Sequence, residues 1–456
     1  YPERRKTEVA EAAQQPVAAP APAADEPSTS WARRHAVPLV VSFVMVATGM
    51  AFALWWLPVT RGVDRWFTPG DLWGIFRAAH YVAWGDLAGV YAKGNGVVAF
   101  PGVPILLAPV AAVSGWLHLT ESMLPFVLPR PTSYLLLGPV EILLATVPVF
   151  GADALADRLG AGVRRRAVLC VAVGVLAWSA SALWGHAEDA LVVGIGLYAL
   201  RAVVDGRWVR AGWLIGFAVA CQPLILLALP ILVAASPSGG RLGFALRSVA
   251  LSSFLVTVSF LGDAADSLRA LVDQPTPPVL NHATPWARLS PHSVEHVGAE
   301  IVPPGWPLVG GTGPLAHPHA TMVFVSGGAA RAAYVVAAVV VGLIVWRRPL
   351  PVRTLVWLVG VVLAARCAFE AVMTPYYLVP PLIVLLAVGA RTSAARFAAA
   401  VAVGLATGWF AYLHLPPWQW WSPVVLGMAA VCVLTRPQQA YGPVLPVDVG
   451  GAAVAS

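Results

Sequence analysis

Long apolar segments recur from residue 37 to residue 435, and short stretches that carry arginine separate them. A soluble domain has about 25% charged residues, whereas this chain has 11%, together with 58% hydrophobic residues. Inside a bilayer such segments can satisfy their backbone hydrogen bonds only as helices or closed barrels, and their length fits helices. The sequence therefore predicts an all-α polytopic membrane protein. The net charge of +7 comes from arginines scattered between apolar spans, which is a topology signal and does not indicate nucleic acid binding.

Arginine also predicts the orientation of the spans. Arg33 and Arg34 precede the first span (37–58), and Arg164–Arg166 follow the second (134–151). Because such residues stay on the cytoplasmic side, the chain between these two spans lies outside. Segment 97–117 contains three prolines, so we expect it to dip into the membrane as part of an outer loop. Further spans are predicted at 167–184, 190–204, 243–261, 330–346, 353–372, 375–390, 396–414 and 419–435, with two short ones in 208–235. The total is about twelve, with both termini inside.

The predicted spans form one transmembrane domain over residues 31–436, with outer loops at 59–133, 185–189 and 262–329. Residues 1–30 are rich in Ala, Pro, Glu and Gln, so we expect a disordered cytoplasmic tail there. Residues 437–456 form a second cytoplasmic tail. The four cysteines all fall inside apolar segments, where we expect small core residues without a disulfide or metal role.

The first outer loop contains Asp71, which follows Pro69-Gly70 and opens a predicted helix over 71–85. One side of this helix is apolar and the other carries Trp73, Arg77 and His80, so it is predicted to lie in the membrane interface. Asp71 can be a helix N-cap, a general base, or both, because a helix N-terminus stabilises an ionised carboxylate. Asp64 is the competing acid, but the flanking Arg61 and Arg65 favour a paired structural role.

Two further polar groups lie at the predicted outer ends of spans. His186, Glu188 and Asp189 follow the third span, and acids so close to hydrocarbon are usually functional or paired, a loop cap being the alternative. Arg366 and Glu370 are four residues apart. They can pair with each other on one helix face, or the arginine can hold a lipid phosphate. The histidines of loop 262–329 have no convincing metal-site spacing, so no metal site is predicted.

The first outer loop resembles that of the GT-C glycosyltransferases in the pattern Asp71-Leu72, Phe76-Arg77-Ala78-Ala79, Gly85, Tyr91, Phe100-Pro101-Gly102-Val103-Pro104 and Ala108-Pro109. The second outer loop and the broken spans after it resemble the same family in Gly185-His186 to Asp189, residues 212–218 and Gln222-Pro223. The predicted late outer turn, Pro375-Tyr376-Tyr377-Leu378, also resembles this family. The resemblance covers residues 38–390. It is greatest to the branch of actinobacterial envelope enzymes that use polyprenyl-phosphate mannose or arabinose.

This resemblance implies a GT-C-like fold in the bacterial cytoplasmic membrane, with the active site on the outer face. It implies inverting transfer of mannose or arabinofuranose from a polyprenyl-phosphate donor to a cell-envelope glycolipid or polysaccharide. Asp71 would be the general base, and Glu188 or Asp189 the second acidic motif. Many relatives have Lys where this chain has Gln222, so the phosphate partner stays open. Candidates for binding donor phosphate or substrate are Arg77, His80, Lys93, His186, Arg288, Arg366, Tyr376 and Tyr377. No cofactor is certain, and a divalent metal is left open.

Two other classes compete with the glycosyltransferase. A lipid or glycan transporter or flippase would also have broken helices, but it would show internal repeats and charges at the membrane midplane. This sequence has no convincing repeat, and its acids lie at the outer ends of spans. A non-catalytic membrane scaffold is the third possibility. The chain has no Gly-rich phosphate loop of the Walker type, so ATP is not indicated as an energy source.

Overall fold

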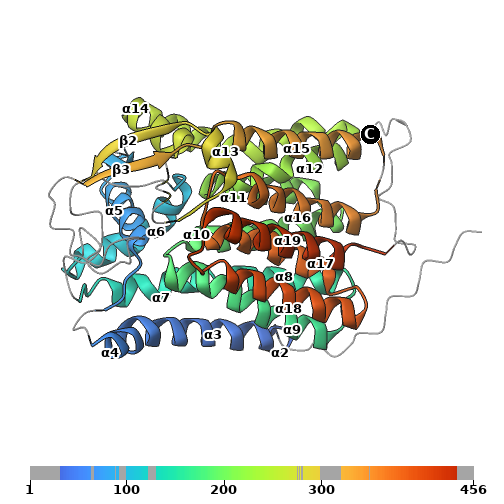
Figure 1. The fold of residues 1–456 in the computed structure, drawn as a ribbon, viewed down its shortest axis with the longest axis horizontal. Helices are drawn as coiled ribbons and strands as arrows, with labels where there is room; N and C mark the ends of the chain where they lie inside the picture. The colour runs from blue at the N-terminus through green and yellow to red at the C-terminus, as the bar shows by residue number, and fades with distance from the viewer. Residues whose placement is uncertain are drawn as a thin grey trace, which may run out of the picture.

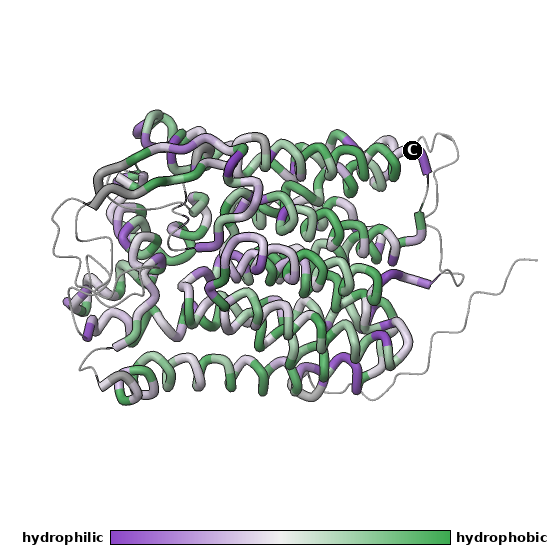
Figure 2. The backbone as a smooth tube through the Cα atoms, viewed as in Figure 1, coloured by the Kyte–Doolittle hydropathy of each residue, from purple (hydrophilic) through white to green (hydrophobic). Residues whose placement is uncertain are grey.

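The computed structural model describes residues 31–62, 66–87, 89–91, 99–121, 130–274, 276, 278, 281–297, 320–348 and 350–438. The long helices in these ranges lie roughly parallel and form a bundle (Figure 1). Hydrophobic residues run along the helices, and hydrophilic residues gather toward the two ends of the bundle (Figure 2). The prediction of an all-α membrane protein is thereby confirmed at the level of the class. The predicted tails and the segment around Asp64 lie outside the described residues.

The first half of the chain forms α2 (Trp31–Arg34), α3 (Ala36–Ala51), η1 (Phe52–Trp56), α4 (Leu57–Arg61), α5 (Gly70–Ala83), η2 (Gly89–Tyr91), α6 (Gly102–Trp116), α7 (Tyr134–Leu144), α8 (Val147–Arg158), α9 (Val163–Trp178), η3 (Ser179–Leu183) and α10 (Ala187–Val204). The middle of the chain forms α11 (Trp208–Cys221), η4 (Pro223–Ala228), α12 (Leu229–Ala235), η5 (Ser238–Gly240), α13 (Arg241–Gly262), α14 (Ala264–Leu268), η6 (Arg269–Asp273), β1 (His282–Ala283), η7 (Pro285–Leu289), β2 (His292–Val297) and β3 (Ala320–Val325). The last part forms α15 (Gly328–Arg347), α16 (Val352–Phe369), β4 (Val372–Met373), η8 (Pro375–Leu378), α17 (Val379–Gly389), α18 (Ala394–Phe410) and α19 (Pro417–Thr435).

Seven helices in the described ranges are long and apolar enough to cross a bilayer. They span Ala36–Thr60, Tyr134–Arg158, Val163–Leu183, Ser238–Gly262, Ala330–Arg347, Val352–Phe369 and Pro417–Thr435. Each coincides with a predicted span, and shorter apolar helices occupy most of the other predicted positions. The count of about twelve spans stays a prediction. Pro223 ends α11 and starts η4, because proline cannot continue the hydrogen-bond ladder of a helix.

Helix α10 lies in the centre of the bundle, where it packs against α8, α11 and α17. Its side chains are buried almost all round, including Glu188 and Asp189 in its first turn. A helix that is surrounded in this way holds its end groups in fixed positions. The first turn of α10 is therefore a rigid platform for polar chemistry at one end of the bundle.

The long loop predicted at 262–329 takes part in two short antiparallel pairings that the sequence did not predict. Strand β1 pairs with β4, with His282 opposite Met373, and β2 pairs with β3, with His292 opposite Val325. Neither β2 nor β3 has the strict alternation of apolar and polar residues that marks a strand. The β1–β4 pairing ties the loop to the segment that leads into η8.

The predicted orientation can be tested by labelling single cysteines at Gly70 and Gly162. Gly162 precedes a 21-residue helix, Val163–Leu183, which separates the two ends of that span by about 30 Å. We expect an impermeant thiol reagent to label the Gly70→Cys protein in intact cells and the Gly162→Cys protein only after permeabilisation. Both should be made in a background without native cysteines. Labelling of Gly162→Cys from outside would reverse the orientation.

Candidate active site

The starts of α5 and α10 approach each other closely at one end of the bundle. Gly185 precedes α10 with a φ of +73°, and a Cβ atom there would lie 2.8 Å from the Cβ atoms of both Leu72 and Pro69. Both the positive φ and the lack of space require glycine. This contact places His186 beside Asp71, 115 residues earlier in the chain.

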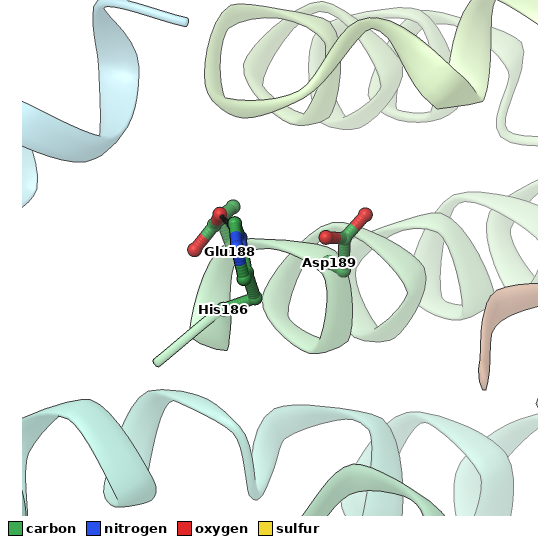
Figure 3. A group of neighbouring side chains, drawn as sticks. All are labelled: His186, Glu188 and Asp189. Carbon is green, nitrogen blue, oxygen red and sulfur yellow. Dashed lines mark hydrogen bonds and ion pairs between the residues drawn. The ribbon is translucent and has the colours of Figure 1, made fainter. Parts of the chain in front are cut away.

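Asp71, His186 and Glu188 form a hydrogen-bonded row. His186 Nε2 lies 2.9 Å from Asp71 Oδ2, and the other ring nitrogen, Nδ1, contacts Glu188 Oε1. The side chains of His186 and Glu188 are 7% and 3% exposed, whereas that of Asp71 is 60% exposed. Figure 3 shows His186 and Glu188 side by side at the start of α10. The row thus leads from a buried carboxylate to a carboxylate that faces solvent.

The carboxylates around His186 favour the charged form of its imidazole. Burial by itself would lower the pKa of His186, but the carboxylates of Glu188 and Asp71 outweigh this effect and raise the pKa well above 6.5. A protonated imidazole donates from both nitrogens. It therefore donates one hydrogen bond to each carboxylate and leaves the other oxygen of Asp71, Oδ1, available.

Two more carboxylates lie next to this row. Asp189 and Glu141 are both buried, and the backbone of Ala187 lies beside Glu141. The charge of Glu141 interacts with Glu188 and His186, and the side chain of Gln222 lies beside Asp189. Sequence reasoning missed Glu141, although an acid inside the apolar segment 134–158 was a signal for a functional residue.

A metal ion is one possible occupant of the cluster. The ligand atoms of His186, Glu188 and Asp189 lie within 4.8 Å of one another. Both ring nitrogens of His186 contact carboxylates in this structure. A cation would therefore take its ligands from the oxygens of Glu188 and Asp189, or from His186 once the ring gave up one of these contacts.

Aromatic rings connect His186 to a cationic group. The ring of Tyr376 stacks on His186 with centroids 4.1 Å apart, and Tyr377 meets Tyr376 edge-on at 4.9 Å. The guanidinium of Arg366 lies 3.8 Å from the centre of the Tyr377 ring. Arg366 is also close enough to Asp189 for their charges to attract each other. An acidic side and a cationic side therefore belong to one continuous site.

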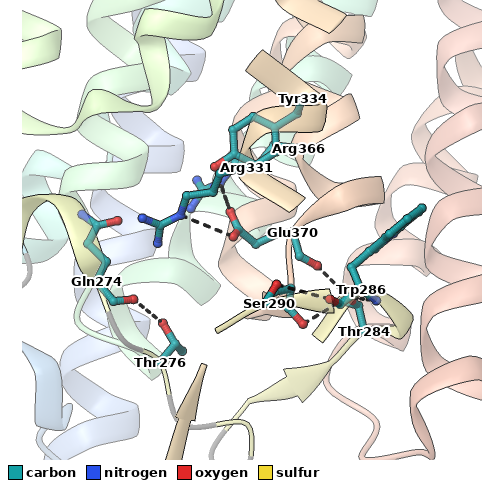
Figure 4. A network of polar contacts seen from close by, with 10 residues as sticks. Gln274, Thr276, Thr284, Trp286, Ser290, Arg331, Tyr334, Arg366 and Glu370 are labelled. Carbon is teal, nitrogen blue, oxygen red and sulfur yellow. Dashed lines mark hydrogen bonds and ion pairs between the residues drawn. The ribbon is translucent and has the colours of Figure 1, made fainter. Parts of the chain in front are cut away.

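Glu370 organises the cationic side. Its carboxylate accepts from Arg366 Nε at 3.1 Å and from the Tyr334 hydroxyl at 3.4 Å, and Arg331 Nε lies 3.8 Å away. Figure 4 shows the two arginines converging on Glu370 from α15 and α16. Of the two roles considered for Arg366, the ion pair with Glu370 is confirmed, while a role toward phosphate stays a prediction.

Other predicted site residues lie outside this cluster or outside the described ranges. Arg288 is exposed on η7 and has no side-chain hydrogen bond or ion pair to any described residue. His80 Nε2 lies 2.6 Å from Glu121 Oε1, so this ring faces the segment after α6 and not the acidic row. Arg77 lies on α5 between Asp71 and His80. Lys93 belongs to the segment that the structure does not describe.

Two details of the predicted outer helix were wrong. Pro69 is the N-cap of α5, and Asp71 lies inside the first turn, where its carboxylate contacts His186. Capping therefore does not explain Asp71. Trp73, placed on the polar side, is 2% exposed, and its Nε1 donates to Thr68 Oγ1 at 3.0 Å. The buried side of α5 packs on α6, so protein covers residues that were expected to face lipid.

A scan against protein-family models gave no match to this chain, and a search of curated protein sequences gave none either.

The contact at Gly185 leads to a prediction about assembly of the site. We expect Gly185→Ala to lower both stability and activity, because alanine at positive φ costs about 1–2 kcal/mol and its Cβ would meet Leu72 and Pro69. Gly239→Ala is the matched control, since a Cβ at that position meets nothing within 4 Å. Thermal unfolding of both variants measures the effect. Equal unfolding temperatures for the two would show that the approach of α5 to α10 tolerates a side chain.

Proposed function

We propose that this protein is a membrane glycosyltransferase that moves a sugar from a polyprenyl-phosphate donor to a cell-envelope glycolipid or glycan, with Asp71 as the general base. The observation that carries the proposal is the solvent-exposed carboxylate of Asp71, held by His186 at the edge of a buried polar cluster. A base must be able to reach the substrate, and the side chain of Asp71 is 60% exposed.

The proposed reaction uses the two sides of the site differently. Asp71 accepts the proton of an acceptor hydroxyl, and the hydroxyl oxygen forms a bond to the anomeric carbon of the donor sugar. The bond between that carbon and the phosphate oxygen breaks, and the lipid phosphate leaves with the electron pair. Attack from the opposite face inverts the configuration. Arg366 would stabilise the negative charge on the leaving phosphate.

The position of the polar groups supports this proposal. Helix α5, whose first turn carries Asp71, lies at one end of the bundle (Figure 1), where a lipid-bound donor and a glycolipid or glycan acceptor can meet. Among the described residues, the cationic Arg366 is linked to this row through two tyrosines. The donor sugar, mannose or arabinofuranose, follows only from the resemblance in sequence.

A lipid or glycan transporter or flippase is the second candidate, and one observation favours it. Glu141 and Asp189 are buried, and buried acids at membrane depth mark ion pathways in transporters. In a transporter, Asp71 would not have to remove a proton from a sugar hydroxyl.

One experiment separates these two functions. The purified protein is reconstituted in liposomes with radiolabelled polyprenyl-phosphate mannose or arabinose and a glycolipid acceptor. A glycosyltransferase produces labelled acceptor in detergent as well as in sealed liposomes. A transporter moves label across the bilayer without changing the acceptor, and such a result would refute the proposed function.

The proposed phosphate contact predicts a second loss of function. Arg366→Gln should weaken donor binding by about tenfold or more, because a hydrogen bond to a charged group contributes about 1.5–3 kcal/mol. Arg288→Gln is the matched control, since Arg288 is exposed and lies outside the cluster. Donor affinity is measured by equilibrium binding. Unchanged affinity in Arg366→Gln with a loss in Arg288→Gln would move the phosphate site to the outer loop.

A further inference from the structure

An apolar groove lies between the η4–α12 segment and α15. Leu229, Pro230 and Val233 line one wall, and Val339, Leu343 and Trp346 line the other, around a volume of about 360 Å³. At the bottom of the groove Gly342 contacts Pro230. A Cβ atom added to Gly342 would lie 2.8 Å from Pro230 Cβ. The helices touch there and leave a channel along their outer side.

The lining of the groove is suited to hydrocarbon. All nine lining residues are apolar or glycine, apart from the indole nitrogen of Trp346, so water would find few partners there. Val339, Leu343 and Trp346 are 44%, 55% and 53% exposed. Because α15 is one of the helices that can cross a bilayer, these exposed side chains face lipid. An acyl chain can enter the groove from the side.

One end of the groove carries a fixed positive charge. The guanidinium of Arg241 lies 3.8 Å from the centre of the Trp346 ring, and its Nε donates to the Ser236 carbonyl at 3.3 Å. Arg347 follows Trp346 in the chain. Segments 206–262 and 327–352 contain no aspartate or glutamate, so no acid from these segments neutralises the arginines. Basic pockets between transmembrane helices bind phosphate-bearing lipid head groups.

From this geometry we propose that the groove binds a phospholipid with an anionic head group. One acyl chain lies between α12 and α15, and the phosphate is bound by Arg241 above Trp346. Trp346 is in the last turn of α15, whereas Arg331 of the candidate active site is in its first turn, which separates the two by about 20 Å. The bound lipid is therefore distinct from the donor of the proposed function, and the proposal does not depend on that function.

Native mass spectrometry of the full chain in detergent tests the proposal. The probes are phosphatidylglycerol, phosphatidylcholine and inorganic phosphate, each titrated alone. We expect phosphatidylglycerol to bind most tightly and phosphate alone not to bind measurably. Arg241→Gln should weaken phosphatidylglycerol binding by about tenfold or more, while Arg207→Gln should not. Arg207 is the control because it is exposed and has no side-chain hydrogen bond or ion pair to a described residue.

A separate variant, Leu343→Trp, tests whether the groove binds an acyl chain. Leu343→Trp fills the groove from an exposed position and leaves Arg241 in place, so it should weaken phosphatidylglycerol binding even if Arg241→Gln does not fold. Equal affinity for the two lipids, or equal affinity in the Arg241→Gln and Arg207→Gln proteins, would overturn the head-group assignment. Tight binding of phosphate alone, or unchanged binding in Leu343→Trp, would overturn the role of the groove.

Discussion

Replacing Asp71 by asparagine should reduce sugar transfer by about 100-fold or more, which is the usual loss when a general base is removed. Asparagine keeps an oxygen that can accept the hydrogen bond from His186 Nε2, so the row and the fold should stay intact. It removes the charge that accepts the proton. The measurement is the rate of labelled product formation by equal amounts of folded protein, with donor binding measured in parallel.

Asp64→Asn is the control for this prediction, because Asp64 is the acid nearest to Asp71 in the sequence of the predicted outer loop. It should transfer at nearly the normal rate. Near-normal transfer by Asp71→Asn together with a loss in Asp64→Asn would assign the base to Asp64. If both variants are active, the remaining acids are Glu188 and Asp189, and the transporter becomes the better reading.

A second large effect is expected for His186→Phe. Phenylalanine can still stack on Tyr376, but it removes the hydrogen bonds to Asp71 and Glu188. Asp71 then loses its fixed position, and misplacing a reacting group by about 1 Å can cost about 100-fold in rate. Glu188 stays buried without its partner, which costs about 3–5 kcal/mol of stability. Transfer rate and thermal unfolding should therefore both fall.

A double variant separates these two consequences. His186→Phe combined with Glu188→Leu removes the unpaired buried charge, so it should unfold at a higher temperature than the single variant. It cannot restore the hydrogen bond to Asp71, so transfer should stay low. His186→Gln, which keeps one donor, should retain more activity than His186→Phe. Recovery of transfer together with stability in the double variant would show that His186 has only a structural role.

Local patterns in the sequence predicted much of the fold. Runs of apolar residues predicted the positions of the seven long helices, because a bilayer accepts few other structures over such lengths. The same reasoning predicted the helix that begins near Asp71 and the break at Pro223. It did not predict the β2–β3 pairing, which depends on a partner strand, nor the burial of Trp73, which depends on α6.

The candidate site was predicted as separate residues and assembled only by tertiary contacts. The sequence by itself determined that Asp71, His186, Glu188 and Arg366 lie near the ends of spans, since charge is expelled from hydrocarbon. The tertiary structure decided that Asp71 bonds to His186 across 115 residues of chain, because only a glycine at 185 lets α5 and α10 meet. The tertiary structure also places Glu141 next to Glu188 and His186, and it directs His80 toward Glu121. Sequence spacing describes neighbours along one helix, and contacts between helices depend on how their surfaces pack.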